Sequence, residues 1–251
     1  MSLRISGHSF KDQFMNRIVF MFVIIFAVSY RYSVHGINPV GLNPATGTAD
    51  QDTIQKKQIL YNGVLWENKY HRIKGDQFLF SDIFLTGTIY IDGKAFRNVR
   101  IKYDLYLDEL LTPLNLGEIL KLNREKVDSF NLTIENKLYR FVNIRNEAVK
   151  GFIGYTNVLY EGKTKLYVKY SKKISPSSSS QYDGEFYQSP QTFMIKENAV
   201  FQINSPRDLF GILNTKGNQV KDYVKKNKIK VSKSLPESYL PVVRFYDSIS
   251  Q

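Results

Sequence analysis

Residues 78–111 read FLFSDIFLTGTIYIDGKAFRNVRIKYDLYLDELL, with apolar residues at every second position on both sides of Asp92-Gly93. Such alternation is typical of half-buried β-strands. The Asp-Gly pair suits a two-residue type I′ turn, because both central residues of that turn take positive φ. The stretch therefore predicts a β-hairpin in which Ile89 lies opposite Phe96. The rest of the chain is expected to extend or cover this sheet.

The parity of the apolar residues changes within the second arm of the hairpin. Before the turn, one face carries Ile83, Leu85, Ile89 and Ile91. After Phe96 the apolar positions are Val99, Ile101, Tyr103, Leu105 and Leu107. A one-residue slip sends every side chain to the opposite face, so an extra residue must enter if the same face stays buried. We expect a β-bulge at Arg97-Asn98.

Alternating segments continue from residue 58 to residue 203, with tight turns expected at Glu135-Asn136-Lys137, Glu161-Gly162 and Glu197-Asn198. In residues 163–170, Leu166 and Val168 share one face while lysines and Tyr167 occupy the other. This pattern indicates an antiparallel sheet with one face in water. The predicted fold class is mainly β with C-terminal helices (α+β), an antiparallel β-sandwich or half-open barrel covered by two helices.

After residue 204 the apolar period changes from two to about 3.6 residues, which predicts a helical segment over 204–251. Ser205 is a good N-cap, Pro206 suits the first helical position, and Asp208 completes a capping arrangement. A second helix is expected to begin near Pro236-Glu237. A short amphipathic helix is marginal alone in water, so both helices should pack on the sheet, over the face formed by Ile83, Leu85, Ile89 and Ile101.

The first 36 residues resemble a signal peptide. Three basic residues precede the short apolar run IVFMFVIIFAV (18–28), which matches a signal-peptide core better than a membrane span of about 20 residues. Cleavage is expected after Ser29 or after Gly36, with an uncleaved membrane anchor as the alternative. Residues 37–57, rich in Pro, Gly, Asn and Thr, then form a flexible lead-in. The predicted location is the periplasm or the outer cell surface.

Cysteine and histidine are scarce. The 251 residues include no cysteine, which excludes disulfides, thiolate metal sites and thiol catalysis. Beyond residue 36 the only histidine is His71, so neither a histidine metal cluster nor any other cofactor is expected. The whole chain has a net charge of +12. A basic balance favours anionic glycans, lipid headgroups or nucleic acid as partners, and export argues against nucleic acid.

Three residues are candidates for a site. Asp104 and Asp108 would share a face of a strand, and paired carboxylates can hold Ca²⁺ or perform acid/base hydrolysis. Their alternation with apolar residues favours a simpler interpretation, the polar face of a half-buried strand. Trp66, the single tryptophan, is expected to anchor the core or a sheet edge, although it could also bind a ligand.

Several stretches carry a resemblance: YNGVLWENKY (61–70), the hairpin stretch above, FIGYTNVLYEGKTKLYVKY (152–170), and a lysine-rich helix followed by FYDSI (245–249). Together they resemble exported β-rich envelope proteins of Bacteroidota-type Gram-negative bacteria. The resemblance implies a cell-envelope location and no particular activity.

The sequence thus favours a non-enzymatic exported protein that binds an envelope protein or has a structural role, with peripheral contact to the outer membrane. A periplasmic carrier of a lipid or other apolar ligand is the first alternative. A hydrolase that uses Asp104 and Asp108 is the second.

Overall fold

The computed structural model describes residues 58–178 and 180–250. The predicted signal peptide over 1–36, its cleavage after Ser29 or Gly36, and the lead-in over 37–57 lie outside these residues. Within the described part of the chain, no helix is both long and apolar enough to cross a bilayer.

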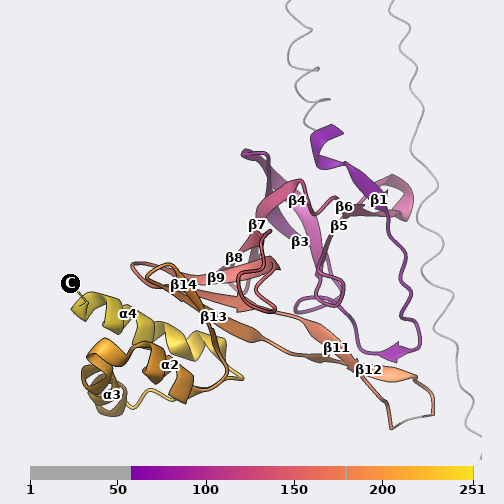
Figure 1. The fold of residues 1–251 in the computed structure, drawn as a ribbon. Helices are drawn as coiled ribbons and strands as arrows, with labels where there is room; N and C mark the ends of the chain where they lie inside the picture. Colours follow the sequence, from indigo (N-terminus) through magenta and orange to yellow (C-terminus); the bar gives the residue numbers. More distant parts are fainter. Residues whose placement is uncertain (1–57, 179, 251) are drawn as a thin grey trace, which may run out of the picture. The chain divides into compact units, whose positions relative to one another are not determined.

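Strands make up most of the regular secondary structure of the described chain (Figure 1). They are β1 (Gly63–Leu65), β2 (Ile73–Lys74), β3 (Leu85–Ile91), β4 (Lys94–Asp104), β5 (Glu109–Pro113), β6 (Ile119–Leu122), β7 (Val127–Ile134), β8 (Lys137–Ile144), β9 (Gly154–Glu161), β10 (Lys165–Lys169), β11 (Lys172–Ser175), β12 (Gly184–Gln188), β13 (Gln191–Lys196) and β14 (Ala199–Ile203). The helices are α2 (Pro206–Ile212), α3 (Gly217–Lys226) and α4 (Leu240–Ile249), with 3₁₀ turns at Asn115–Gly117, Asn214–Lys216 and Pro236–Tyr239.

Eleven strands form one antiparallel sheet in the order β1-β6-β5-β4-β3-β7-β8-β9-β10-β13-β14, and β11-β12-β2 form a small second sheet. The long strand β4 joins two layers, because its first part pairs with β3 and its last three residues pair with β5. The architecture is an open sandwich and not a closed barrel, which confirms the predicted fold class.

Aromatic rings fill the space between the two layers. Phe130 and Phe141 stack with their centroids 4.7 Å apart. Tyr103 meets both rings edge-on at 5.4 Å, and Tyr155 meets Phe130 at 5.2 Å. All four side chains are buried together with leucines of β5 and β6. This interior is therefore packed with side chains from both layers.

The hairpin of β3 and β4 has the predicted geometry. Asp92 and Gly93 take φ of 49° and 73°, as a type I′ turn requires, and Ile89 pairs with Phe96. The register then shifts, so that Thr88 faces the two residues Arg97-Asn98, and Asn98 takes φ of 58°. The predicted β-bulge is confirmed. The tight turns at Glu135-Asn136 and Glu197-Asn198 also have two consecutive positive φ values.

Two details of the predicted strands are wrong. β3 begins only at Leu85, and Ile83 lies outside it with 58% of its surface exposed. The second face of β10 is in water only at Lys165, because Tyr167 and Lys169 are 6% and 8% exposed. Phe152 and Phe193 cover Tyr167, while a carboxylate pairs with Lys169. The prediction that this face lies in water was based on the alternating lysines, and it was wrong for Tyr167 and Lys169.

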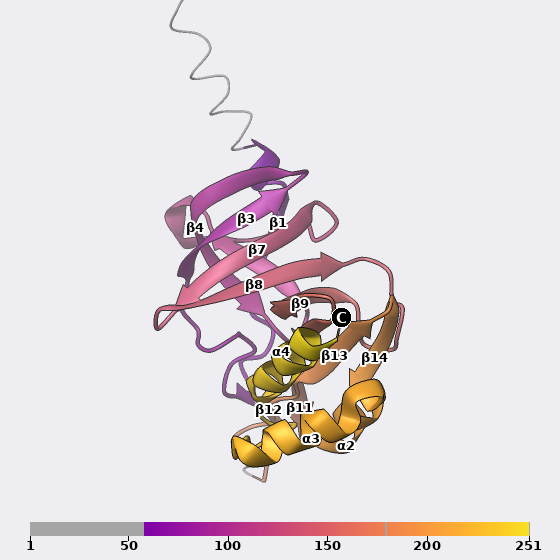
Figure 2. The same ribbon diagram turned by 90° about the vertical axis from the view of Figure 1, so that its left-hand side faces the viewer.

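The helices pack on β10, β13 and β14, at the end of the large sheet opposite β1 (Figure 2). Ser205 caps α2 by accepting a hydrogen bond from the Asp208 amide at 3.2 Å, as expected for an N-cap. Leu209 and Leu213 then join a buried cluster with Leu166, Met194 and Ile203 of the strands. The face of Ile89 and Ile101, predicted as the contact surface, is instead covered by the other layer of the sandwich. The prediction of that surface was wrong because it ignored this second layer.

Candidate binding site

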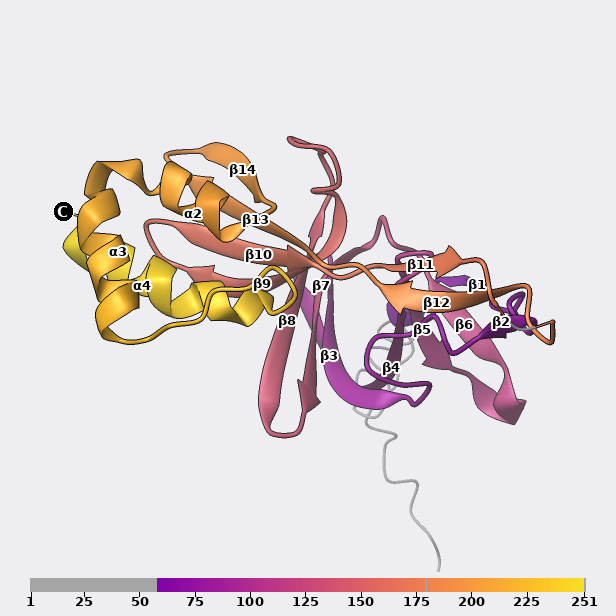
Figure 3. The same cartoon turned by 90° about the horizontal axis from the view of Figure 1, so that it is seen from below.

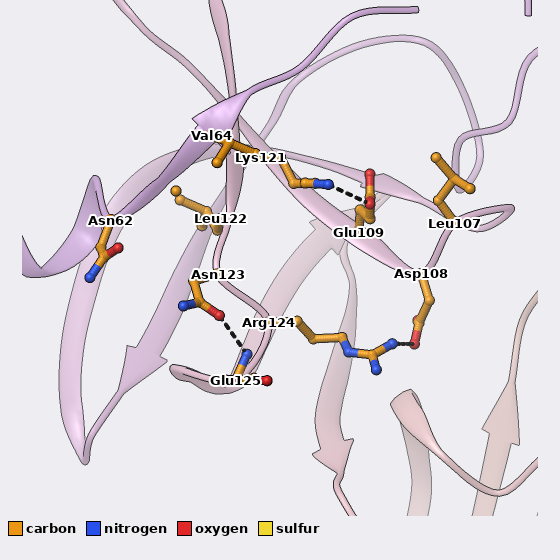
Figure 4. A pocket seen from close by; sticks show the side chains of 11 residues that line it. Asn62, Val64, Leu107, Asp108, Glu109, Lys121, Leu122, Asn123, Arg124 and Glu125 are labelled. Carbon is orange, nitrogen blue, oxygen red and sulfur yellow. Dashed lines mark hydrogen bonds and ion pairs between the residues drawn. The ribbon is translucent and has the colours of Figure 1, made fainter. Parts of the chain in front are cut away.

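A pocket of about 490 Å³ opens beside β1, at one end of the strand order (Figure 4). Three segments form its walls: the start of β1, the turn between β4 and β5, and the end of β6 with the loop that follows. Its lining residues are Asn62, Gly63, Val64, Leu107, Asp108, Glu109, Lys121, Leu122, Asn123, Arg124 and Glu125. None of these eleven has a hydroxyl, thiol or imidazole group.

Asp104 builds the turn that places Asp108 in this pocket. One carboxylate oxygen of Asp104 accepts hydrogen bonds from the backbone N–H groups of Tyr106 and Leu107, at 2.8 and 2.9 Å. Such a bond pattern stabilises a turn directly after the aspartate. β4 therefore ends at Asp104, and Asp108 sits in the turn with a φ of 58°. The two aspartates do not alternate along one exposed strand as predicted, and Asp104 is fully buried.

Asp108 is the centre of a partly buried polar network. Its Oδ1 accepts hydrogen bonds from the Tyr103 hydroxyl at 2.5 Å and from Lys169 Nζ at 2.6 Å. Its Oδ2 accepts bonds from Arg124 Nη1 at 3.2 Å and from the Tyr155 amide at 3.4 Å. Both carboxylate oxygens are thus satisfied by groups from four different segments, which fixes the Asp108 side chain at the inner edge of the pocket.

Burial governs the electrostatics of the network. Burial lowers the pKa of Lys169, while the adjacent Asp108 carboxylate acts in the opposite direction. Burial and the same carboxylate raise the pKa of Tyr103, which keeps its hydroxyl protonated as a donor. Gly154 makes the close approach of Asp108 feasible. A Cβ there would lie 1.8 Å from Asp108 Oδ2, and the φ of 73° at this position also favours glycine.

The other charged groups of the pocket are held in place. Lys121 donates to Glu109 at 2.9 Å across the β5–β6 pair (Figure 4). Asn143 donates to the carbonyl oxygens of Arg124 and Val127, at 2.8 and 2.9 Å, and so fixes the loop that carries Arg124. The pocket is thus a preformed polar surface, with Arg124 about half exposed at its mouth.

The outer edge of β1 is the rim of the pocket. β1 pairs only with β6 among the described strands, so its other edge carries no strand from this part of the chain. Hydrogen bonds from the Trp66 amide to Ile119 and from the Asn123 amide to Asn62 show which residues face β6. By the alternation of an antiparallel ladder, the backbone groups of Gly63 and Leu65 point to the free edge.

The edge is also apolar. Val64 and Leu65 are 57% and 60% exposed, and the neighbouring Tyr61 is 42% exposed. An exposed apolar edge strand is a template for pairing with another chain, and soluble proteins usually protect such edges. This edge and the adjoining pocket together are called the β1 surface below.

The three candidate residues predicted from the sequence lie in different places in the structure. Asp108 lines the pocket, Asp104 does not, and Trp66 is half-buried with its ring 5.9 Å from the Phe78 ring. No cluster of metal-binding side chains occurs in residues 58–178 and 180–250. Sequence reasoning missed Lys169 and Arg124, which lie 61 and 16 positions from their partner Asp108. No local pattern links such distant residues.

Asp104 leads to a prediction about pH. Burial raises the pKa of Asp104 from 3.8 to about 6, although two backbone hydrogen bonds oppose the change. The folded state thus binds this proton more tightly than the unfolded state, so the contribution of Asp104 to stability is present below about pH 4 and is lost as pH rises through 6. We expect Asp104→Asn to raise the free energy of unfolding above pH 6, by up to about 3 kcal/mol. Asparagine retains the acceptor oxygen of the turn.

Urea unfolding of both proteins at pH 4, 5, 6 and 7.5 measures this effect. The free energy of unfolding of the variant should be close to that of the unchanged protein at pH 4 and should exceed it most at pH 7.5. A constant difference across this range would contradict the prediction.

Comparisons of the chain with protein-family models, with curated proteins and with solved structures found no match.

Proposed function

We propose that this protein is an exported, non-enzymatic binding protein of the cell envelope, which takes an extended segment of a partner protein along the β1 surface. One observation carries the proposal: an apolar strand edge, to which no strand of residues 58–178 and 180–250 is paired, lies on the rim of a preformed polar pocket. A peptide that adds to a sheet edge gains affinity from main-chain hydrogen bonds and specificity from adjacent pockets. The sequence of residues 1–36 supports export.

The charged groups of the pocket suit recognition better than catalysis. Asp108 and Glu109 already have cationic partners at 2.6 and 2.9 Å, so neither is poised as a free acid or base. Arg124 offers half-exposed donors to a partner carbonyl or carboxylate. A hydrolase that uses Asp104 and Asp108 receives less support, because only Asp108 faces the pocket. The aromatic filling of the sandwich gives an apolar carrier less support as well.

The test removes one of the two backbone N–H donors, those of Gly63 and Leu65, that point to the free edge of β1. Leu65→Pro removes the N–H that points to the free edge, while Leu65→Ala removes the side chain and keeps the N–H. Proline is tolerated on an edge strand when its N–H side faces solvent, so the sheet should remain folded. We expect Leu65→Pro to weaken partner binding by at least about fivefold relative to Leu65→Ala, because a net hydrogen bond contributes about 1 kcal/mol.

The partner is first identified by a photo-reactive amino acid at position 64 in cells, with position 138 as the control. Leu138 is 62% exposed, similar to Val64, but it lies on β8 outside the β1 surface. A discrete adduct from position 64 alone supports the proposal. The proposal fails if both positions give the same adducts, or if Leu65→Pro binds the partner as well as Leu65→Ala.

A further inference from the structure

The helical end of the chain carries a concentrated positive charge. Residues 214–235 hold seven lysines against one acidic residue, Asp222, which gives this segment a net charge of +6. The lysines are Lys216, Lys221, Lys225, Lys226, Lys228, Lys230 and Lys233. We call them the lysine surface.

All seven side chains of the lysine surface are exposed, and none forms an ion pair with a carboxylate in the described part of the chain. Several lysines of the sheet differ in this respect. Lys121, Lys169 and Lys172 each lie within 3 Å of a carboxylate oxygen. The positive field at the helical end is therefore not neutralised locally, and it is available to an external anion.

A concavity of about 530 Å³ lies within this region, between α2 and α3. Arg207 and Lys221 line it together with Phe210, Gly211 and Asn214. Arg207, like Lys221, has no ion pair among the described residues. Two cations and a side-chain amide at one hollow match the donors that bind a phosphate group. Lys225 follows Lys221 by one helical turn and so extends the same face of α3.

We propose that the lysine surface docks on an anionic phospholipid bilayer, with Arg207 and Lys221 at the phosphate of one lipid headgroup. Lysines spread along a surface act as point charges, which suits a planar array of anionic headgroups. Binding of single-stranded nucleic acid usually adds exposed aromatic side chains for base stacking. On α3 the one aromatic side chain, Tyr223, is instead stacked on Phe245, with the rings 4.0 Å apart and inclined by 3°.

This surface is independent of the β1 surface. α2 contacts β14, at one end of the strand order, and α3 packs on α2 and α4, whereas β1 forms the other end (Figure 3). A partner at β1 and a bilayer at the helices would therefore contact different parts of the domain. Failure of one proposal leaves the other intact.

Sedimentation with lipid vesicles tests the inference. Vesicles of phosphatidylglycerol and phosphatidylcholine at equal amounts should bind the protein, vesicles of phosphatidylcholine alone should not, and 0.5 M NaCl should release it. We expect Lys221→Gln/Lys225→Gln to lower the partition coefficient by about 25-fold, or about fivefold for each lysine, the fold change that corresponds to about 1 kcal/mol per charge. Arg207→Gln should act in the same direction.

The control removes the same charge elsewhere. Lys94→Gln/Lys126→Gln changes two exposed lysines away from the helical end, one on β4 and one in the turn before β7, that form no ion pair in residues 58–178 and 180–250. This variant should bind the anionic vesicles within about twofold of the unchanged protein, and melting curves should show that all variants are folded. An equal loss in the control would show that net charge alone acts and would overturn the site. Binding to heparin or to a DNA fragment without binding to anionic vesicles would overturn the assignment to a bilayer.

Discussion

Replacement of Asp108 by asparagine is expected to lower the free energy of unfolding at pH 7 by about 3–5 kcal/mol. Lys169 is 8% exposed, and Asp108 is its only carboxylate partner in the described part of the chain. The substitution would leave the Lys169 ammonium buried without a counter-charge. Removal of one member of a buried ion pair is costly for this reason, even where the intact pair contributes little. Equilibrium urea unfolding measures the loss.

Two companion variants make the interpretation specific. Asp104→Asn is the same chemical change four positions earlier. It should stabilise the protein at pH 7, because burial raises the pKa of Asp104 and no cation of the described residues forms an ion pair with it. Asp108→Asn/Lys169→Met removes both charges and should recover part of the lost stability. A loss below about 1 kcal/mol for Asp108→Asn would show that water reaches Lys169 in solution and that the network is not the closed arrangement described above.

Truncation of Leu213 to alanine is expected to cost about 2–5 kcal/mol and to lower the stability of the sheet and the helices together. Leu213 is fully buried at the end of α2, in one cluster with Leu166 and Met194 of the strands. The loss of a leucine side chain there removes contacts on both elements at once. The far-ultraviolet and near-ultraviolet circular dichroism signals should therefore follow a single unfolding curve.

Leu138→Ala is the matched control for Leu213→Ala. Leu138 is 62% exposed, and substitutions at such positions usually stay within about 0.5 kcal/mol. If helical signal is lost from Leu213→Ala before the sheet unfolds, the helices form a separate unit, and the shared cluster does not couple them to the strands.

Local chemistry explains which parts of the fold could be predicted. The Asp92-Gly93 turn, the bulge at Asn98 and the Ser205 cap depend on residues within a few positions of each other, so their signals lie in short stretches of sequence. Pairing between distant residues has no such signal. Asp108 looked like a residue on an exposed strand face, and only the folded chain brings Lys169 to it.

The docking of the helices could be predicted in part. Their apolar faces showed that a partner surface was needed, and Leu209 and Leu213 are indeed buried. The sequence did not show which sheet face was free, since that depends on the path of β4 between two layers. The β1 surface was missed for a related reason, because the edge position of a strand is a property of the whole sheet order.

The long hairpin ribbon of the domain has a mechanical consequence. β10 continues into β11, and β12 continues into β13, so both strands of one hairpin ribbon run between the large sheet and the small one. Where the ribbon passes from one sheet to the other, Ser171 and Ser189 are joined by two hydrogen bonds of 2.7 Å. Tension between the two sheets would therefore be carried along continuous backbone. The parallel pair of β2 and β12, with the Arg72–Asp183 ion pair at 2.8 Å beside it, transmits that tension to the segment that follows β1.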